Sequence, residues 1–160
     1  MAAAQSSANN YNGLGTSPSQ RHVVDQTQTM KIIQAATAQA LNITSSSNIA
    51  VVDPSATLVG FLRTDNAWAG SIDIAIKKAR TVALFNGAFT TAQLQNSSIP
   101  GGGLYGLEET NGGLVVFGGG LPLFVDGFFI GAVGVSGGTV DQDVDVCTAG
   151  VDAVGGKLSS

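Results

Sequence analysis

The spacing of hydrophobic residues changes several times along this 160-residue chain, and each change marks a predicted element. Between residues 24 and 41 the apolar positions recur close to every 3.6 residues, which predicts a helix. These positions are Ile32, Ile33, Ala36, Ala40 and Leu41. Two β-branched runs follow at 49–53 and 57–62, separated by Pro54-Ser55, and they predict two adjacent antiparallel strands.

A second helix is predicted from a cap at Asp65-Asn66 to about Phe85. Its expected inner face follows a 4-3-4 spacing and consists of Ile72, Ile76, Ala79 and Ala83. On the opposite face, Asp73 and Lys77 are four residues apart in the favourable acid-first order, which predicts a solvent-exposed ion pair.

Lys78 occupies a different position on the same helix. Its neighbours one turn away in each direction are Ile74 and Val82, so its side chain leaves the helix on a largely apolar flank. An amine in that setting extends to solvent or meets an anion. The pattern therefore singles out Lys78 as a candidate functional cation.

The second half of the chain predicts a short helical turn at 90–95, a glycine loop at 100–103, and strands at 114–117, 121–125 and 128–135. Asp126-Gly127 is a strong hairpin signal between the last two strands, and Pro122 indicates that its own strand is an edge strand or starts late. Thr139 and Gln142 have the spacing of a capping box, and Val140 to Val154 predict a closing amphipathic helix.

These elements give the order α-β-β-α-β-β-β-α, an α+β arrangement without an internal repeat. Residues 1–22 are rich in Ala, Ser, Asn and Gly and show no periodicity, which predicts a flexible N-terminal arm. Residues 23–160 are expected to form a single domain, since their length and 44% hydrophobic content suffice for one core.

Composition narrows the function classes. The net charge is −4 with only seven Lys and Arg residues, so the basic surface of a nucleic-acid-binding protein is missing. No run of about 18 apolar residues is free of polar or glycine interruptions, so we expect a soluble chain without a membrane partner. Cys147 is the single cysteine and is expected to be a buried small residue.

Localisation stays open at this point. The first five residues lack the apolar core of a signal peptide, and they are also consistent with what remains after such a peptide is removed. Asn42-Ile-Thr44 and Asn96-Ser-Ser98 are glycosylation sequons, which permit secretion without proving it. A secreted protein and a cytoplasmic protein are both compatible with the sequence.

Several motifs occur in one order along residues 24–158, and together they resemble the GlcG and HbpS-like domain family, named in part for haem binding and haem degradation. The motifs that carry the resemblance are Ile49-Ala-Val-Val-Asp53, Phe61-Leu-Arg-Thr-Asp65, Ser71-Ile-Asp-Ile-Ala-Ile-Lys-Lys-Ala79, Phe117-Gly-Gly-Gly-Leu-Pro122 and Ile130-Gly-Ala-Val-Gly-Val-Ser-Gly-Gly138, followed by Asp141 and Asp143. The resemblance implies a five-stranded antiparallel sheet flanked by helices, assembly into homo-oligomers, and haem binding in some relatives.

The chain departs from the family at a position that bears on haem. Many members have a Gly-His pair after the first strand, where this chain has Ala56 and Thr57. The single histidine, His22, lies in the arm, Met30 is more typical of a core residue, and Tyr105 is a weak candidate for ferric iron. We therefore expect that no cofactor is required. Haem stays a candidate ligand, but it would have to bind without the histidine that many family members have at the position of Thr57.

Three residues are candidates for catalysis. Lys78 could hold a carboxylate or stabilise an enolate, or else be a surface-reaching lysine or an intersubunit ion pair. Arg63 ends a strand, where it could bind a carboxylate or pair with Asp65. Glu108 could act as a general base, although a solvated loop edge is the simpler interpretation.

The segment 111–138 places 10 glycines among short β-branched and aromatic runs. Glycine inside a strand marks a bend, a bulge or a close approach of another group, and backbone N–H groups ahead of a helix favour an anion. Turn formation is the alternative explanation. The residues expected to contact a ligand are Tyr105, Gly118, Gly119, Gly120, Ser136, Gly137 and Gly138.

No metal site is expected. Asp141 and Asp145 share a helix face, while Asp143 points elsewhere, and a zinc site would need a second histidine. Three functions remain open. The first is an oligomeric domain that binds a small organic ligand with a carboxylate in a glycine-lined pocket, and a haem-like molecule is one candidate ligand. The second is a cofactor-free isomerase, lyase or cyclase that polarises a carbonyl with Lys78, Arg63 and backbone N–H groups, and the third is a structural protein whose glycines serve subunit packing.

Overall fold

The computed structural model describes residues 21–158, and the predicted arm at 1–22 lies almost wholly outside this range. The elements are α1 (Gln26–Asn42), β1 (Asn48–Val52), β2 (Leu58–Arg63), α2 (Gly70–Leu84), α3 (Thr91–Ser98), the short 3-10 helix η3 (Leu107–Glu109), β3 (Gly120–Val125), β4 (Phe128–Ser136) and α4 (Val140–Asp152). The predicted α+β class is confirmed.

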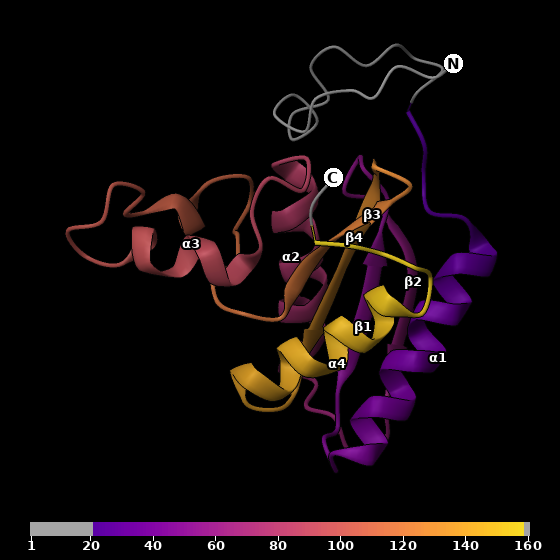
Figure 1. The fold of residues 1–160 in the computed structure, drawn as a ribbon. Helices are drawn as coiled ribbons and strands as arrows, with labels where there is room; N and C mark the ends of the chain where they lie inside the picture. The colour runs from indigo at the N-terminus through magenta and orange to yellow at the C-terminus, as the bar shows by residue number, and fades with distance from the viewer. Residues whose placement is uncertain (1–20, 159–160) are drawn as a thin grey trace.

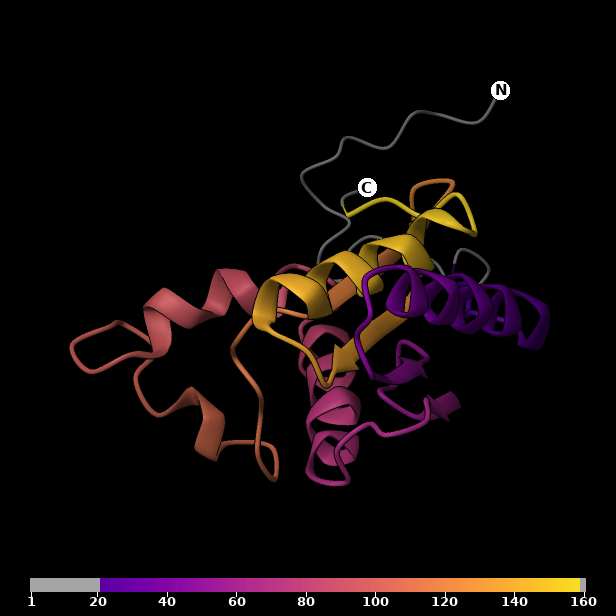
Figure 2. The ribbon, with the colours of Figure 1, turned by 90° about the horizontal axis from the view of Figure 1, so that it is seen from below.

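The described residues form three layers around one antiparallel sheet. Helices α1 and α4 cover one face of the sheet and α2 covers the other, which is clearest in the view from below (Figures 1 and 2). Helix α3 and the loops after it project sideways from this body. Within the described range, no helix is long and apolar enough to cross a membrane.

The sheet has the strand order β2-β1-β4-β3, so β1 and β4 are its central strands. Every residue of β1 is buried because both of its faces are covered. Ile49 and Val51 pack in the core beneath α1 and α4, whereas Ala50 and Val52 pack against α2. This two-sided burial explains the uninterrupted apolar run that predicted the strand.

The predicted fifth strand, at 114–117, does not form, and the sheet has four strands in the part of the chain that the structure describes. This segment bonds to other elements: the N–H of Leu114 donates to Glu108 O, and the N–H of Val115 donates to Thr81 Oγ1 on α2 at 3.1 Å. The segment makes these bonds to α2 and to η3, and it is not part of the sheet.

The predicted inner face of α2 is displaced around the helix. Ile72 and Ile76 are only partly buried, and the buried residues of α2 are Ser71, Ala75, Lys78, Ala79, Thr81, Val82 and Ala83. Small residues are needed here because β4 approaches closely: a side chain at Gly134 would collide with Ala75 O and Ala79 N. This displacement turns Lys78 inward.

Several local signals are confirmed. Asp126 and Gly127 have φ angles of 51° and 81°, the conformation of a tight hairpin turn, and β3 with its Pro122 is an edge strand. Thr139 and Gln142 form a reciprocal capping box at α4. The predicted cap at Asp65-Asn66 is wrong, because Asn66 has a φ of 65° within a turn and α2 begins only at Gly70.

Candidate functional site

The side chain of Lys78 on α2 is fully buried and lies against Gly119, directly before β3. Its Nζ donates to Asp143 Oδ2 at 2.7 Å and to the carbonyl oxygen of Val135 at 2.9 Å. The ring of Phe117 lies 4.7 Å from the same ammonium, within the range of a cation–π contact. The sequence predicted that the Lys78 amine would either extend to solvent or meet an anion. It meets an anion, and that anion is the carboxylate of Asp143 in the same chain.

Asp143 completes the pair from the first turn of α4, on the other side of the sheet from α2. Its Oδ1 accepts the N–H of Gly138 at 3.0 Å. The sequence offered the glycine N–H groups ahead of this helix either as an anion site or as a turn. In the structure, the N–H of Gly138 donates to the carboxylate of Asp143 of the same chain. The ion pair links the two helical layers through the end of the sheet.

Burial dominates the titration of this cluster. It lowers the pKa of Lys78, and the hydrogen bond and negative charge of Asp143 act in the opposite direction. It raises the pKa of Asp143, against the hydrogen bond and positive charge of Lys78. Burial also raises the pKa of the nearby Cys147 thiol, whose predicted burial is confirmed.

The glycines expected to face a ligand are packed against the chain itself. A side chain at Gly119 would meet Lys78 Nζ and the carbonyl oxygen of Val135, both at 2.7 Å, and one at Gly118 would meet Val140. Gly120 abuts the backbone of Lys78.

The second expected set lies at the end of β4. Gly137 abuts the carbonyl of Ser46, and a side chain at Gly138 would meet Ser45 and Gln142. Ser136 is buried, and its carbonyl oxygen accepts from Asn48 Nδ2 at 3.4 Å. Close packing within the chain therefore accounts for these glycines.

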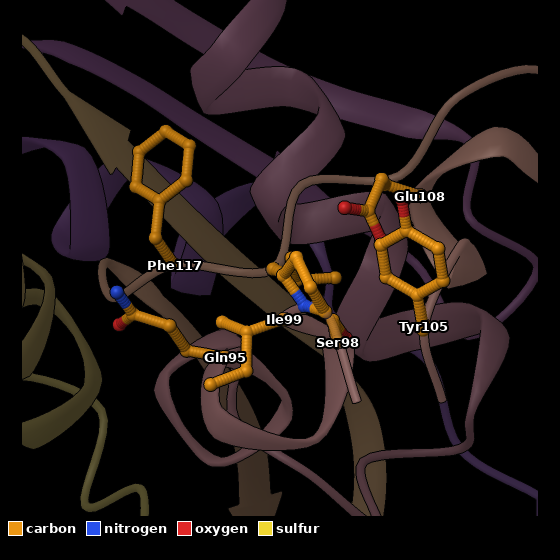
Figure 3. Close-up of a pocket in the computed structure, with 8 residues that line it drawn as sticks. Gln95, Ser98, Ile99, Tyr105, Glu108 and Phe117 are labelled. Carbon is orange, nitrogen blue, oxygen red and sulfur yellow. The ribbon is translucent and has the colours of Figure 1, made fainter. Parts of the chain in front are cut away.

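A cavity of about 270 Å³ lies beside α3, in the part of the molecule that projects from the sheet. It is lined by Gln95, Ser98, Ile99, Pro100, Tyr105, Glu108, Val116 and Phe117. In Figure 3, Tyr105 and Glu108 lie on one side of this group and Phe117 lies on the other. Two predicted site residues, Tyr105 and Glu108, are thus brought to one cavity.

The carboxylate of Glu108 is the least satisfied polar group of this cavity. Its Oε2 is buried and has no hydrogen-bond partner among the described residues. The residue is held in place by its backbone, since Glu108 O accepts the N–H of Leu114 at 2.9 Å. A buried acceptor without a donor is unfavourable, and a ligand that supplies a donor would relieve it.

The loop between α3 and Glu108 is shaped by glycines. Gly101 and Gly106 have φ angles of 87° and 84°, and a side chain at Gly102 would collide with Ser97 O. The N–H of Leu104 donates to Ser97 O at 2.8 Å, which closes the loop onto α3. These glycines shape the loop beside the cavity, whereas the glycines predicted to contact a ligand are Gly118 to Gly120 and Gly137-Gly138.

Arg63 lies elsewhere, at the end of β2. Its guanidinium donates through Nε and Nη2 to Ala67 O at 2.9 and 2.7 Å. It forms no ion pair with Asp65 among the described residues. Neither Arg63 nor Lys78 lines the cavity, so the three predicted catalytic residues do not form one site.

The residues considered as iron ligands are scattered. Thr57, at the family histidine position, is exposed on the loop before β2. The His22 ring packs in a tilted arrangement against Phe128, with ring centroids 4.3 Å apart. Met30 is 54% exposed on α1, so its expected place in the core is wrong.

The cavity beside α3 offers few ligands for haem iron. Of the candidate iron ligands, only Tyr105 lines it, and Tyr105 is 68% exposed.

The acidic residues of α4 are engaged separately. Asp143 pairs with Lys78, and Asp145 accepts from Gln39 Nε2 at 2.8 Å. In the described range, no group of three or more His, Cys, Asp or Glu side chains is arranged to hold a metal ion. The expected surface pair is present, with Lys77 Nζ 2.9 Å from Asp73 Oδ2.

Comparison with known proteins places these features in a family. Residues 24–152 match the model of the family described as haem degrading protein HbpS-like. The chain is 43% identical over 114 residues to a 15.0 kDa protein of the dhaT-dhaS intergenic region of Citrobacter freundii, covering 71% of this chain and 79% of that protein.

The chain also matches part of a longer enzyme and a solved structure. It is 35% identical over 125 residues to the corrinoid adenosyltransferase PduO of Salmonella typhimurium, covering 78% of this chain but 37% of that protein. The crystal structure of a PduOC:heme complex superposes with a TM-score of 0.81 at 31% identity, covering 86% of this chain and 99% of that one.

Proposed function

The chain belongs to the HbpS-like family, and on that premise we propose that it is a small-molecule-binding domain whose ligand occupies the cavity beside α3. The observation that carries the proposal is the combination of a mainly apolar cavity with a buried carboxylate oxygen of Glu108 that lacks a donor. Apolar walls with a few directed polar groups are typical of small-molecule sites.

The predicted glycine-lined site for a carboxylate is revised in this proposal. Lys78 and the N–H of Gly138 are the donors that a ligand carboxylate would need, and both are bonded to Asp143. A ligand anion would have to displace a buried carboxylate from its ion pair. We therefore place the ligand against Tyr105 and Glu108.

Lys78 has a supporting role in this arrangement. Its ammonium contacts the ring of Phe117, and Phe117 is part of the cavity wall. The ion pair with Asp143 thereby holds one wall of the site without touching the ligand.

Haem requires separate consideration because the related PduOC structure is a heme complex. The lining of the cavity in this chain contains no histidine. We propose that its ligand is more compact than haem. Addition of haemin should leave the Soret spectrum of free haemin unchanged, and a shifted Soret band would contradict this part of the proposal.

The proposal is tested by filling the cavity. Compact organic fragments are screened by saturation-transfer NMR against the wild type, Val116→Trp in the cavity wall, and Val59→Trp on the exposed face of β2 as a matched control. Fragments that bind should lose their signal with Val116→Trp and keep it with Val59→Trp, while circular dichroism confirms that both variants fold. Undiminished binding to Val116→Trp, or no binding to the wild type, would overturn the proposal.

The unpaired oxygen of Glu108 also favours a second candidate, a cofactor-free enzyme in which Glu108 is the general base. Lys78 and Arg63 would then act only through the fold, since neither lines the cavity. Benzylacetone in D₂O should exchange its α-protons with wild type and with Glu109→Gln, but not with Glu108→Gln. Equal exchange with all three proteins would exclude this role.

A further inference from the structure

We propose that the ligand of the cavity beside α3 is a compact organic amine, whose ammonium group pairs with Glu108 while its apolar body packs on Ile99 and Phe117. This inference rests on the proposed function and adds the chemical class of the ligand. It follows from charge, aromatic lining and size.

The charge of the cavity is negative. Its eight lining residues include the carboxylate of Glu108 and no Lys, Arg or His, and Glu109 is the adjacent residue in η3. An anionic ligand would bring a like charge against a buried oxygen that already lacks a donor. An ammonium group supplies up to three donors and an opposite charge, so it satisfies that oxygen.

The aromatic side chains favour the same class. Tyr105 lies on the same side of the cavity as Glu108, and Phe117 lies on the opposite side (Figure 3). A cation is attracted to the face of an aromatic ring, and proteins use aromatic side chains to bind organic ammonium groups. The ring of Phe117 already contacts Lys78 Nζ, so the ammonium of the ligand is assigned to the Tyr105 side.

The walls favour an apolar body for the rest of the molecule. Ile99, Pro100, Val116 and Phe117 contribute apolar surface, which a hydrocarbon or aromatic body would cover. The cavity opens to solvent, since Tyr105 and Ile99 are 68% and 53% exposed. A ligand with one ring or a short chain would fill its volume of about 270 Å³.

Three probes of nearly equal size separate charge from shape. Phenethylamine is cationic, phenylethanol is neutral and phenylpropionate is anionic at neutral pH. Each is titrated into isotope-labelled protein, and backbone amide shifts report both the affinity and the location of binding. The variant is Glu108→Gln, and the matched control is Glu109→Gln, which changes the same charge at an exposed neighbour outside the cavity lining.

We expect phenethylamine to bind at least about tenfold more tightly than phenylpropionate, a difference of about 1.4 kcal/mol. Glu108→Gln should weaken the binding of phenethylamine about tenfold and leave the affinity for phenylethanol nearly unchanged. Glu109→Gln should change neither affinity by more than about twofold. The shifted amides should be those of residues 95–117. Added salt should weaken the amine more than the alcohol.

The outcomes distinguish this inference from the proposed function. If phenylpropionate shifts the cavity amides at lower concentration than phenethylamine, the site stands and the amine inference is wrong. If amine binding responds equally to Glu108→Gln and Glu109→Gln, the pairing with Glu108 is wrong. If none of the probes shifts residues 95–117, both the inference and the proposed site are overturned.

Discussion

Replacing Lys78 by Met tests whether the buried ion pair holds the two helical layers together. Methionine keeps most of the volume and the unbranched shape of lysine but removes the charge and three donors. In the variant, the carboxylate of Asp143 stays buried, with only 4% of its side chain exposed. It retains the N–H of Gly138 at 3.0 Å as a donor.

The expected loss of stability follows from this environment. Removing one partner of a buried ion pair costs about 3–5 kcal/mol, because the remaining charge is uncompensated. Since Gly138 still stabilises the carboxylate, we expect a value near the lower end, about 3 kcal/mol. That is a large share of the roughly 5–15 kcal/mol that stabilises a typical domain, and it corresponds to a Tm lower by roughly 10 °C.

The assay is urea unfolding followed by circular dichroism, at one protein concentration for all variants. Lys77→Met is the matched control, because it removes a lysine from the next position of the same helix and breaks the exposed pair with Asp73. Such a pair contributes at most about 0.5 kcal/mol. The double variant of Lys78→Met with Asp143→Leu should lose less free energy of unfolding than the two single variants lose when their losses are added.

Equal stabilities of Lys78→Met and Lys77→Met would refute this account of the ion pair. Additive losses in the double variant would refute it as well, because they would show that the two side chains do not stabilise one another. A changed fragment-binding affinity of Lys78→Met with no loss of stability would refute it too, because Lys78 would then affect the site without stabilising the fold.

Four further predictions concern packing and assembly. Gly134→Ala should cost about 1–3 kcal/mol in urea unfolding, because its side chain would meet the backbone of Ala75 and Ala79. Gly70→Ala, with open space around it, should be neutral or stabilising. Cys147 should react with Ellman's reagent only after unfolding, since it is buried and burial raises its thiol pKa; immediate reaction of the folded protein would contradict this burial. Light scattering should give a multiple of the 16.1 kDa chain mass, as the family resemblance predicts, and a monomeric mass would contradict that expectation.

Much of the secondary structure was predictable because its causes are local. The spacing of Ile32, Ala36 and Ala40 predicted α1, and Asp126-Gly127 predicted the last hairpin. A local pattern cannot show whether a strand has a partner. The β-branched run at 114–117 satisfied every local criterion, and its bonds to Thr81 and Glu108 depend on how distant segments pack.

The ion pair shows the same limit for side chains. The apolar neighbours of Lys78 predicted that its amine would need an anion, but Asp143 is 65 residues away and belongs to a different layer. The helical spacing correctly separated Asp143 from Asp141 and Asp145, without indicating where its side chain was directed. The pairing follows from the layered fold, which the sequence pattern does not specify.

The cavity was only partly predictable. Tyr105 and Glu108 were identified from their residue types in the glycine loop, whereas the apolar walls from Ile99 and Phe117 were missed. One available signal was the position of Phe117, directly before three glycines that cannot cover its ring. The sequence predicted that Gly118 to Gly120 and Gly137-Gly138 contact a ligand, and in the structure they pack against the chain itself. The sequence does not distinguish the two, because close approach to a backbone and close approach to a ligand both require glycine.

The most direct test of the proposed site is a crystal structure of the protein with whichever of the three probes binds most tightly. The account predicts that the probe lies in the cavity beside α3, in contact with Glu108 and Phe117, while Lys78 stays paired with Asp143. A probe bound at Gly118 to Gly120 or at Gly137-Gly138, with Asp143 displaced from Lys78, would contradict it.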